Sequence, residues 1–274
     1  MNIKMSLFSA ALGALALGFG APASAAIQTD VIFIVDESGS MGTEQVNLRT
    51  NIGLFASILS GGGQVDAQYG LVGYGNSSVV PRMLTDLTTP ENFATAALGL
   101  VASGGTEPAY TASAFALNAL DGQTSLFSFR PNSIKNLIIL TDEPSNGDTI
   151  ARGAVGGLAV SFAVIDGLLT NNNVLYNAVL TGASTINSIG PLATGHGGAV
   201  FDLASLSTTD QTVVQAFVTD FANAKLQETL DFCVQNPNDP ACVVRQGVSA
   251  PSSMALLGAG LLLTGLYRRR TLLN

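Results

Sequence analysis

The sequence is poor in the side chains that most enzymes and metal clusters use. Its 274 residues include one histidine, two cysteines and no tryptophan. Two cysteines without companion ligands do not make a zinc site. The nucleophile-elbow, zinc-protease and phosphate-loop motifs (G-x-S-x-G, H-E-x-x-H and G-x-x-x-x-G-K-[ST]) do not occur. His196 lies in a glycine-rich loop, where a locally bonded side chain is the simpler interpretation than a catalytic base. We therefore expect that the protein is not an enzyme.

Positive charge is also scarce. Only 11% of the residues are charged, and acidic side chains outnumber basic ones by 19 to 11. Lys4 and the arginines 268–270 lie near the chain ends, so residues 26–247 carry seven basic and 19 acidic side chains, a net charge of −12. Such a surface repels nucleic acid and excludes it as an expected partner.

Two long apolar stretches lie near the ends of the chain. Residues 1–25 contain Lys4, an apolar run and the small residues Ala23-Ser24-Ala25, which predict a secretory signal peptide. Residues 248–267 carry no charge and are followed by three arginines. Twenty such residues can span a bilayer, with the arginines on the cytoplasmic side. We therefore expect an exported protein with a C-terminal membrane segment.

The two cysteines are Cys233 and Cys242. In an exported protein they are expected to form a disulfide, because such compartments are oxidising. The sequence therefore predicts a disulfide-closed linker over residues 231–247, after the last helix of the folded domain.

Between the chain ends lies the length of one domain, residues 27–230. Strand and helix patterns alternate, which predicts an α/β fold with a doubly wound, mostly parallel six-stranded sheet and helices on both faces. One antiparallel edge strand, 77–84, is expected after a turn. The other expected strands are 31–36, 66–74, 135–141, 174–180 and 199–203. The expected helices are 43–59, 90–101, 108–120, 158–169 and 208–229.

Three loops carry the oxygen-bearing side chains Asp36, Ser38, Ser40, Thr106 and Asp142. Two of these loops follow the most apolar strands, which lie side by side in a sheet of order 3-2-1-4-5-6 and open a crevice there. Hydroxyl and carboxylate oxygens suit a hard divalent cation. Taken alone, the first loop could equally be a turn whose serines cap the next helix.

The same loops resemble those of the von Willebrand factor type A family, over about residues 29–229. The matching segments are DESGSM at 36–41, GGT at 104–106 and TDE at 141–143. The resemblance implies a metal-ion-dependent adhesion site that usually holds Mg²⁺ and leaves one position open for a partner's carboxylate.

The resemblance also assigns a role to each residue. Ser38, Ser40 and Thr106 would ligate the ion through their hydroxyls, and Asp36 and Asp142 directly or through water. Ca²⁺ and Mn²⁺ remain possible, because the same ligands serve all three ions.

A glutamate follows a ligand position in each loop, at Glu37, Glu107 and Glu143. One interpretation is that they are solvated loop charges or part of helix first turns. The other is that they add a negative field that tightens cation binding and disfavours very acidic partners. The sequence leaves both interpretations open.

Residues 248–270 resemble a PEP-CTERM sorting signal, with Ser249-Ala250-Pro251 in place of the usual Pro-Glu-Pro. That resemblance implies processing by an exosortase-type enzyme in a Gram-negative bacterium, or else a permanent single-span anchor. The expected function is an exported, metal-dependent adhesion module that binds an acidic group of a protein or extracellular polysaccharide. The alternative is a structural matrix or envelope protein in which the metal only stabilises the fold.

Overall fold

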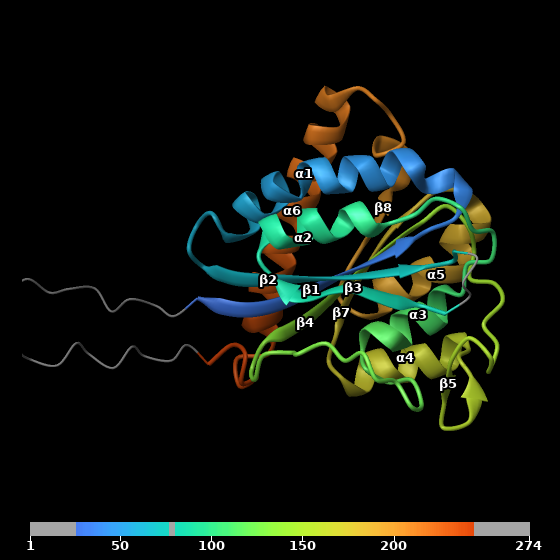
Figure 1. Ribbon diagram of the computed structural model, residues 1–274. Helices are drawn as coiled ribbons and strands as arrows, with labels where there is room; N and C mark the ends of the chain where they lie inside the picture. Colours follow the sequence, from blue (N-terminus) through green and yellow to red (C-terminus); the bar gives the residue numbers. More distant parts are fainter. Residues whose placement is uncertain (1–25, 77–79, 244–274) are drawn as a thin grey trace, which may run out of the picture. The chain divides into compact units, whose positions relative to one another are not determined.

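The computed structural model describes residues 26–76 and 80–243 (Figure 1). The expected signal peptide, 1–25, and the expected sorting signal, 248–270, lie outside the described residues. Within the described part of the chain, every helix is too short or too polar to cross a membrane.

A six-stranded sheet forms the centre of the fold, with strand order β3-β2-β1-β4-β7-β8. All neighbours are parallel except β2 and β3, which pair antiparallel. This is the predicted topology, but the antiparallel edge strand lies later than the predicted 77–84, at Arg82–Thr88. The strands are β1 (Ile27–Asp36), β2 (Val65–Tyr74), β3 (Arg82–Thr88), β4 (Ile134–Thr141), β7 (Leu175–Leu180) and β8 (Val200–Asp202).

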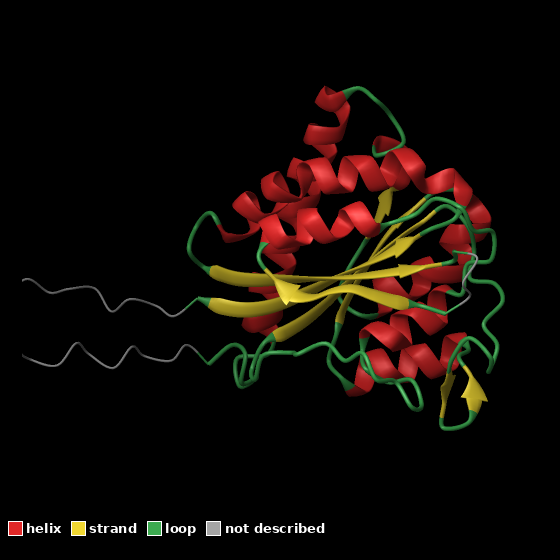
Figure 2. Ribbon diagram, viewed as in Figure 1, coloured by secondary structure: helices red, strands yellow, loops and turns green. Residues whose placement is uncertain are grey.

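Helices cover both faces of the sheet, as predicted (Figures 1 and 2). The helices on one face are α1 (Gly42–Ser60), α2 (Pro90–Ala96) and α6 (Gln211–Gln235). Those on the other face are α3 (Ala109–Ala116), α4 (Phe162–Asn171) and α5 (Ala183–Gly195). Short 3₁₀ turns lie at Gly39–Met41, Ala97–Gly99 and Leu203–Ser205.

The central strand β1 is buried on both faces. Val31, Phe33 and Val35 pack with α1, α2 and α6, whereas Ile32 and Ile34 pack with α3, α4 and α5. None of the five is more than 2% exposed. A strand between two helical layers has no solvent face, which is why its sequence is continuously apolar.

Helix α5 was not among the predicted elements. It contains Pro191, and Gly182 precedes it with a positive φ of 79°, so local sequence reads as loop. Its buried side chains Ile189 and Leu192 are fully enclosed in the core beside β7. Tertiary packing therefore outweighs the cost of a proline inside this helix.

The predicted helix at 158–169 begins later than expected. Residues Ala154–Val155 (β5) and Leu158–Ala159 (β6) form a small antiparallel hairpin instead. Helix α4 starts after Ser161, whose hydroxyl accepts from the backbone N–H of Val164 at 3.4 Å and so caps the helix.

The predicted disulfide between Cys233 and Cys242 is present, with the two Cα atoms 5.0 Å apart. Helix α6 runs six residues past its expected end at 229, to Gln235. Cys233 therefore lies in the last turn of a helix, and the first part of the expected linker is helical.

Candidate metal centre

The carboxylate of Asp36 is fixed at the end of the central strand. Asp36 is fully buried and is the last residue of β1. Its Oδ1 accepts from the backbone N–H of Ser38 at 2.7 Å, and its Oδ2 accepts from Thr141 Oγ1 at 2.7 Å. Thr141 ends the neighbouring strand β4. Two adjacent strand ends therefore hold this carboxylate in one orientation.

The two serines of the first loop lie side by side. The Oγ atoms of Ser38 and Ser40 are 3.1 Å apart. Ser38 is buried and Ser40 is exposed, while Met41 behind them is fully buried. The buried methionine anchors the loop, so that both hydroxyls stay at the open end of the sheet.

The loop before α3 packs directly against the first loop. Gly104 forms a parallel bridge with Ser38, and the backbone N–H of Gly39 donates to the carbonyl oxygen of Gly104 at 3.2 Å. A β-carbon at residue 104 would lie 1.5 Å from the carbonyl oxygen of Gly75. Only glycine permits this approach, which brings Thr106 to the end of β1 and β2.

Thr106 is half-buried between two other glycines. A β-carbon at Gly75 would lie 3.3 Å from the backbone oxygen of Thr106, and one at Gly147 would lie 2.4 Å from its Cγ2. Gly147 belongs to the loop that follows Asp142. The three predicted loops therefore meet around Thr106.

Two hydrogen-bonded pairs tie the third loop to the start of α3. Asn146 Nδ2 donates to Glu107 Oε2 at 2.6 Å. Asp148 Oδ1 accepts from both the backbone N–H and the hydroxyl of Thr111, at 2.8 and 2.7 Å. Burial raises the pKa of the Asp148 carboxyl, and the hydrogen bonds from Ser145 and Thr111 oppose that rise.

Asp142 supplies the observation that bears most directly on a cation. Its Oδ1 is buried and has no hydrogen-bond partner among the described residues. Its backbone oxygen accepts from Thr185 Oγ1 at 2.9 Å, which fixes the loop to α5. A buried carboxylate oxygen without a donor is costly, and a bound cation would satisfy it. The residues therefore fit a hard divalent metal ion.

Burial raises the pKa of two carboxyls beside these loops. The pKa of Asp36 rises to about 7 because the side chain is desolvated, and hydrogen bonds from Thr141 and Ser38 only partly offset this. Burial also raises the pKa of Glu107, with Asn146 opposing and with Glu143 and Asp142 adding repulsion. Such concentrated negative charge without a counter-ion is what a cation would offset.

The three glutamates beside the predicted ligands differ in their surroundings. Glu143 is exposed, as expected of a solvated loop charge. Glu107 is only 3% exposed, and Glu37 is fully buried in an ion pair with Arg82 at 2.5 Å. The interpretation of Glu37 as a solvated charge is therefore wrong.

Sequence reasoning missed several residues that shape this centre. Gln45 of α1 donates from Nε2 to the backbone oxygens of both Asp36 and Val101, each at 2.9 Å. Thr141 was placed in a matching motif but given no role. The sequence position of Gln45 did not indicate this role, because its partners depend on how α1 crosses the sheet.

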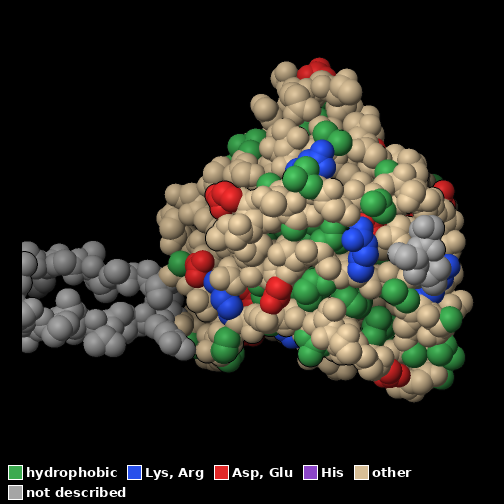
Figure 3. Space-filling view, viewed as in Figure 1, with side chains coloured by type: hydrophobic (Ala, Val, Ile, Leu, Met, Phe, Trp, Pro, Cys, Tyr) green, Lys and Arg blue, Asp and Glu red, His purple; other side chains and the backbone are tan. Residues whose placement is uncertain are grey.

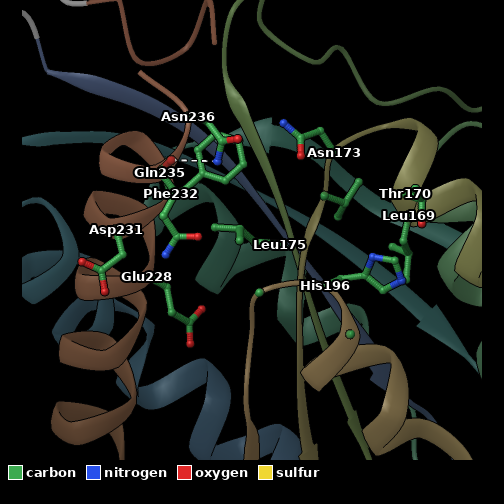
Figure 4. Close-up of a pocket in the computed structure, with 13 residues that line it drawn as sticks. Leu169, Thr170, Asn173, Leu175, His196, Glu228, Asp231, Phe232, Gln235 and Asn236 are labelled. Carbon is green, nitrogen blue, oxygen red and sulfur yellow. Dashed lines mark hydrogen bonds between the residues drawn. The ribbon is translucent and has the colours of Figure 1, made fainter. Parts of the chain in front are cut away.

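A second concavity lies at the other end of β7, with a volume of about 400 Å³ (Figure 4). Residues of α6, including Glu228 and Phe232, lie along one side of it, and Leu175 and His196 lie across from them. His196 Nε2 is 2.9 Å from Asp166 Oδ1, so this histidine is locally bonded, as expected. Most of the other polar side chains that line the concavity are also paired within the protein.

Among residues 26–76 and 80–243 there is no group of three or more His, Cys, Asp or Glu side chains placed to hold an ion. On the face shown in Figure 3, acidic and basic side chains are scattered and do not gather into a patch of one sign.

The family model of the von Willebrand factor type A domain matches residues 30–185, more than half of the chain. The protein therefore belongs to the von Willebrand factor type A family, whose domains serve as adhesion or protein-interaction modules. A search of curated proteins found no match.

Solved structures with a similar trace include proximal thread matrix protein 1 from the mussel byssus, in two crystal forms. Both have a TM-score of 0.47 and 18% identity, and the matches cover 70% and 71% of this chain and 49% and 47% of the mussel chains. A variant of the PilB minor pilin from Streptococcus sanguinis has a TM-score of 0.46 and 12% identity, covering 76% of this chain and 63% of the pilin. The chain thus spans about half the length of the mussel protein. At these scores the similarity carries no information about function.

Proposed function

We propose that this protein is a divalent-cation-dependent binding module that captures an acidic group of its partner. The proposed ligands are Asp36, Ser38, Ser40, Thr106 and Asp142. The unsatisfied, buried Oδ1 of Asp142 is the observation that carries the proposal, because it leaves an acceptor that the protein itself does not use.

The donor set suits Mg²⁺, which takes six oxygens in a near-octahedral array and keeps waters readily. Two carboxylates balance the charge of such an ion, and three hydroxyls add neutral oxygens. When bound, the ion would supply a Lewis-acidic position at which a carboxylate from the partner can replace a water. Ca²⁺ and Mn²⁺ accept the same ligands, so the identity of the ion is part of the test.

Within the protein, three of the five proposed ligands have neighbours that orient them or their loops. Thr141 holds Asp36, and Thr185 holds the backbone of Asp142. Gly104 lets the loop of Thr106 approach the first loop. The site therefore needs little rearrangement to receive an ion, which favours tight binding.

The partner we propose is a protein or an extracellular polysaccharide that carries carboxylates. The region 26–247 has a net charge of −12 and repels such a partner at long range. The metal ion is then required for the protein to bind this partner, because the two would otherwise repel each other.

We further propose that the protein is exported, and that an exosortase-type enzyme processes its C-terminal segment or that this segment stays as an anchor. The signal-like residues 1–25 and the segment 248–270 motivate this part of the proposal. The Cys233–Cys242 disulfide supports it, since disulfides persist in oxidising compartments.

Thermal unfolding of the purified chain in EDTA, Mg²⁺ and Ca²⁺, beside the Asp142→Ala variant, tests the metal centre. Ligand linkage predicts a melting temperature that rises with metal concentration in the wild type and stays constant in the variant. An equal response in both proteins, or no response in either, would overturn the proposed site.

Adhesion separates the proposed function from its alternative, a matrix or envelope protein in which the metal only stabilises the fold. We expect Asp142→Ala to abolish metal-dependent binding to carboxylate-bearing polysaccharide or protein. Loss of stability with unchanged adhesion and biofilm cohesion would favour the structural alternative instead.

A further inference from the structure

Glu37 lies between two proposed ligands, yet its side chain is directed toward a different part of the fold. It is fully buried over β2, where a β-carbon at Gly73 would lie 2.6 Å from the Glu37 carboxyl carbon. Gly73 thus leaves the space that the carboxylate fills. The charge of Glu37 is therefore enclosed in the protein and is not spread toward a bound cation.

The carboxylate of Glu37 receives four hydrogen bonds from three segments. Its Oε1 accepts from Arg82 Nη2 at 2.5 Å and from the backbone N–H of Val101 at 2.9 Å. Its Oε2 accepts from Asn76 Nδ2 at 2.7 Å and from Arg82 Nε at 3.2 Å. The two-point contact with arginine is a strong, directional one.

The backbone of Glu37 makes further contacts with the same segments. Its N–H donates to the carbonyl oxygen of Tyr74 at 2.7 Å. Its carbonyl oxygen accepts from the N–H groups of Ser103 and Gly104 at 2.9 and 3.1 Å. Together with Val101, three amides of the segment just before Thr106 are bound to this single residue.

We propose that Glu37 is a positioning residue of the metal centre, which fixes the loop of Thr106 against Ser38 and Ser40 and thereby favours Mg²⁺ over Ca²⁺. This inference rests on the proposed function. Mg²⁺ requires oxygens at about 2.0–2.1 Å in a strict array, whereas Ca²⁺ accepts more ligands at about 2.3–2.6 Å in flexible geometry. Because three of its amides are held, the loop of Thr106 keeps the metal site small enough for Mg²⁺. If the loop were loosened, the site would admit the larger Ca²⁺.

The informative substitution is Glu37→Gln, which preserves the size of the side chain. The amide keeps one acceptor oxygen, but it removes the negative charge opposite Arg82 and places an N–H₂ group against donors. Residues that orient metal ligands from outside typically change metal affinity by about 10- to 100-fold when replaced. We expect a loss of Mg²⁺ affinity in that range and a smaller loss for Ca²⁺.

The other end of β1 supplies a matched control. Asp30 is also fully buried and is also paired with an arginine, its Oδ1 lying 2.7 Å from Arg130 Nε. It precedes Glu37 by seven positions along β1 and its end, which is about 23 Å at roughly 3.3 Å per residue. Asp30→Asn makes the same chemical change in a buried ion pair far from the proposed ligands.

The experiment is isothermal titration of the full chain with Mg²⁺ alone and with Ca²⁺ alone, for the wild type and both variants. Urea unfolding of the same samples records the loss of stability. We expect both variants to be less stable than the wild type. Only Glu37→Gln should lower the preference for Mg²⁺ over Ca²⁺, by about tenfold.

Three results would overturn the inference: unchanged Mg²⁺ affinity in Glu37→Gln, equal losses for the two ions, or the same loss in Asp30→Asn. If the wild type binds neither ion, the proposed function fails first, and that outcome is distinct from the others. Should Glu37→Gln not fold, Arg82→Lys keeps the positive charge without the two-point contact and must shift the preference in the same direction.

Discussion

The backbone of Gly104 lies directly against the carbonyl oxygen of Gly75. A β-carbon on residue 104 would be 1.5 Å from that oxygen and 2.7 Å from the Cα of Asn76. This contact joins the end of β2 to the loop that carries Thr106. It sets how closely the loop of Thr106 approaches the end of β2, beside the first loop of the proposed metal centre.

Gly104→Ala should therefore abolish Mg²⁺ binding, because the loop must move by more than an ångström to admit a methyl group. Gly105→Ala is the matched control, since a β-carbon at residue 105 has no atom within 4 Å. Titration of the two variants with Mg²⁺ checks this. Equal affinities in the two alanine variants would contradict the role given to the contact.

The affinity for Mg²⁺ should depend on pH near neutrality. Burial raises the pKa of Asp36 to about 7 in the metal-free protein, so the ion must displace a proton at lower pH. Affinity should then rise about tenfold per pH unit up to pH 7 and level off above it. Titrations between about pH 5 and pH 8 check this, and a flat profile would contradict it.

Glu107 and Glu143 remain the two glutamates able to add a negative field at the centre. The structure places Glu107 among the buried carboxyls and Glu143 at the surface. We expect Glu107→Gln combined with Glu143→Gln to weaken Mg²⁺ binding severalfold, with most of the loss from Glu107. Calorimetric titration of both single variants and the double variant measures each share. Unchanged affinity in the double variant would leave both glutamates without a role in metal binding.

An ion pair within α6 should matter for stability and not for binding. Lys225 is fully buried, and its Nζ lies 2.5 Å from Glu228 Oε2, which also accepts from Asn177 Nδ2 at 3.1 Å. Burial lowers the pKa of Lys225, while Glu228 opposes that change. Glu228→Gln should cost roughly 3 kcal/mol of unfolding free energy, because it leaves an unpaired buried ammonium.

Lys225→Met is the companion variant for that prediction. It removes the charge and keeps an apolar stem, so it should cost less than Glu228→Gln. Urea unfolding of both variants provides the comparison. If Lys225→Met lowers the unfolding free energy more than Glu228→Gln does, the ion pair stabilises the fold by more than the cost of burying its charges.

Removal of the disulfide should weaken the fold but leave the metal centre intact. Cys233 and Cys242 close a short loop with a sequence separation of 9. The chain-entropy estimate for such a loop is roughly 2–3 kcal/mol. A double alanine variant should lose about that much stability in urea while its Mg²⁺ affinity stays within twofold. A large loss of affinity would indicate that the two ends of the fold are coupled.

The sequence predicted the elements whose environment is uniform along their length. Strands β1 and β4 are buried on both faces, so their apolar runs identify them and their ends mark the positions of Asp36 and Asp142. Helix α5 was not predicted because Pro191 and nearby glycines disfavour a helix locally. The helix forms because it packs against β7. The local sequence pattern does not show secondary structure that is stabilised by contacts with residues far away in the chain.

The same reason explains what was missed at the metal centre. The proposed ligand positions follow from loop motifs, but the enclosed position of Glu37 was not predicted, because its partner Arg82 lies 45 residues away on the antiparallel edge strand. Nothing in the spacing of Gly75 and Gly104 indicates that their backbones touch. Contacts between loops depend on the twist and order of the strands, which must be known first.

The position of the disulfide has a mechanical consequence. In a chain held at its C-terminal end, tension enters at Cys242 and crosses directly to Cys233 in the last turn of α6, so residues 234–241 bear no load. The start of β1, at Ile27, packs in the same cluster as both cysteines, and Asp36 lies at the other end of that strand. If a partner is bound at the proposed metal centre, a pull on Asp36 loads β1 along its length. Its hydrogen bonds to β2 and β4 then share the force in shear, the direction in which many bonds must break together.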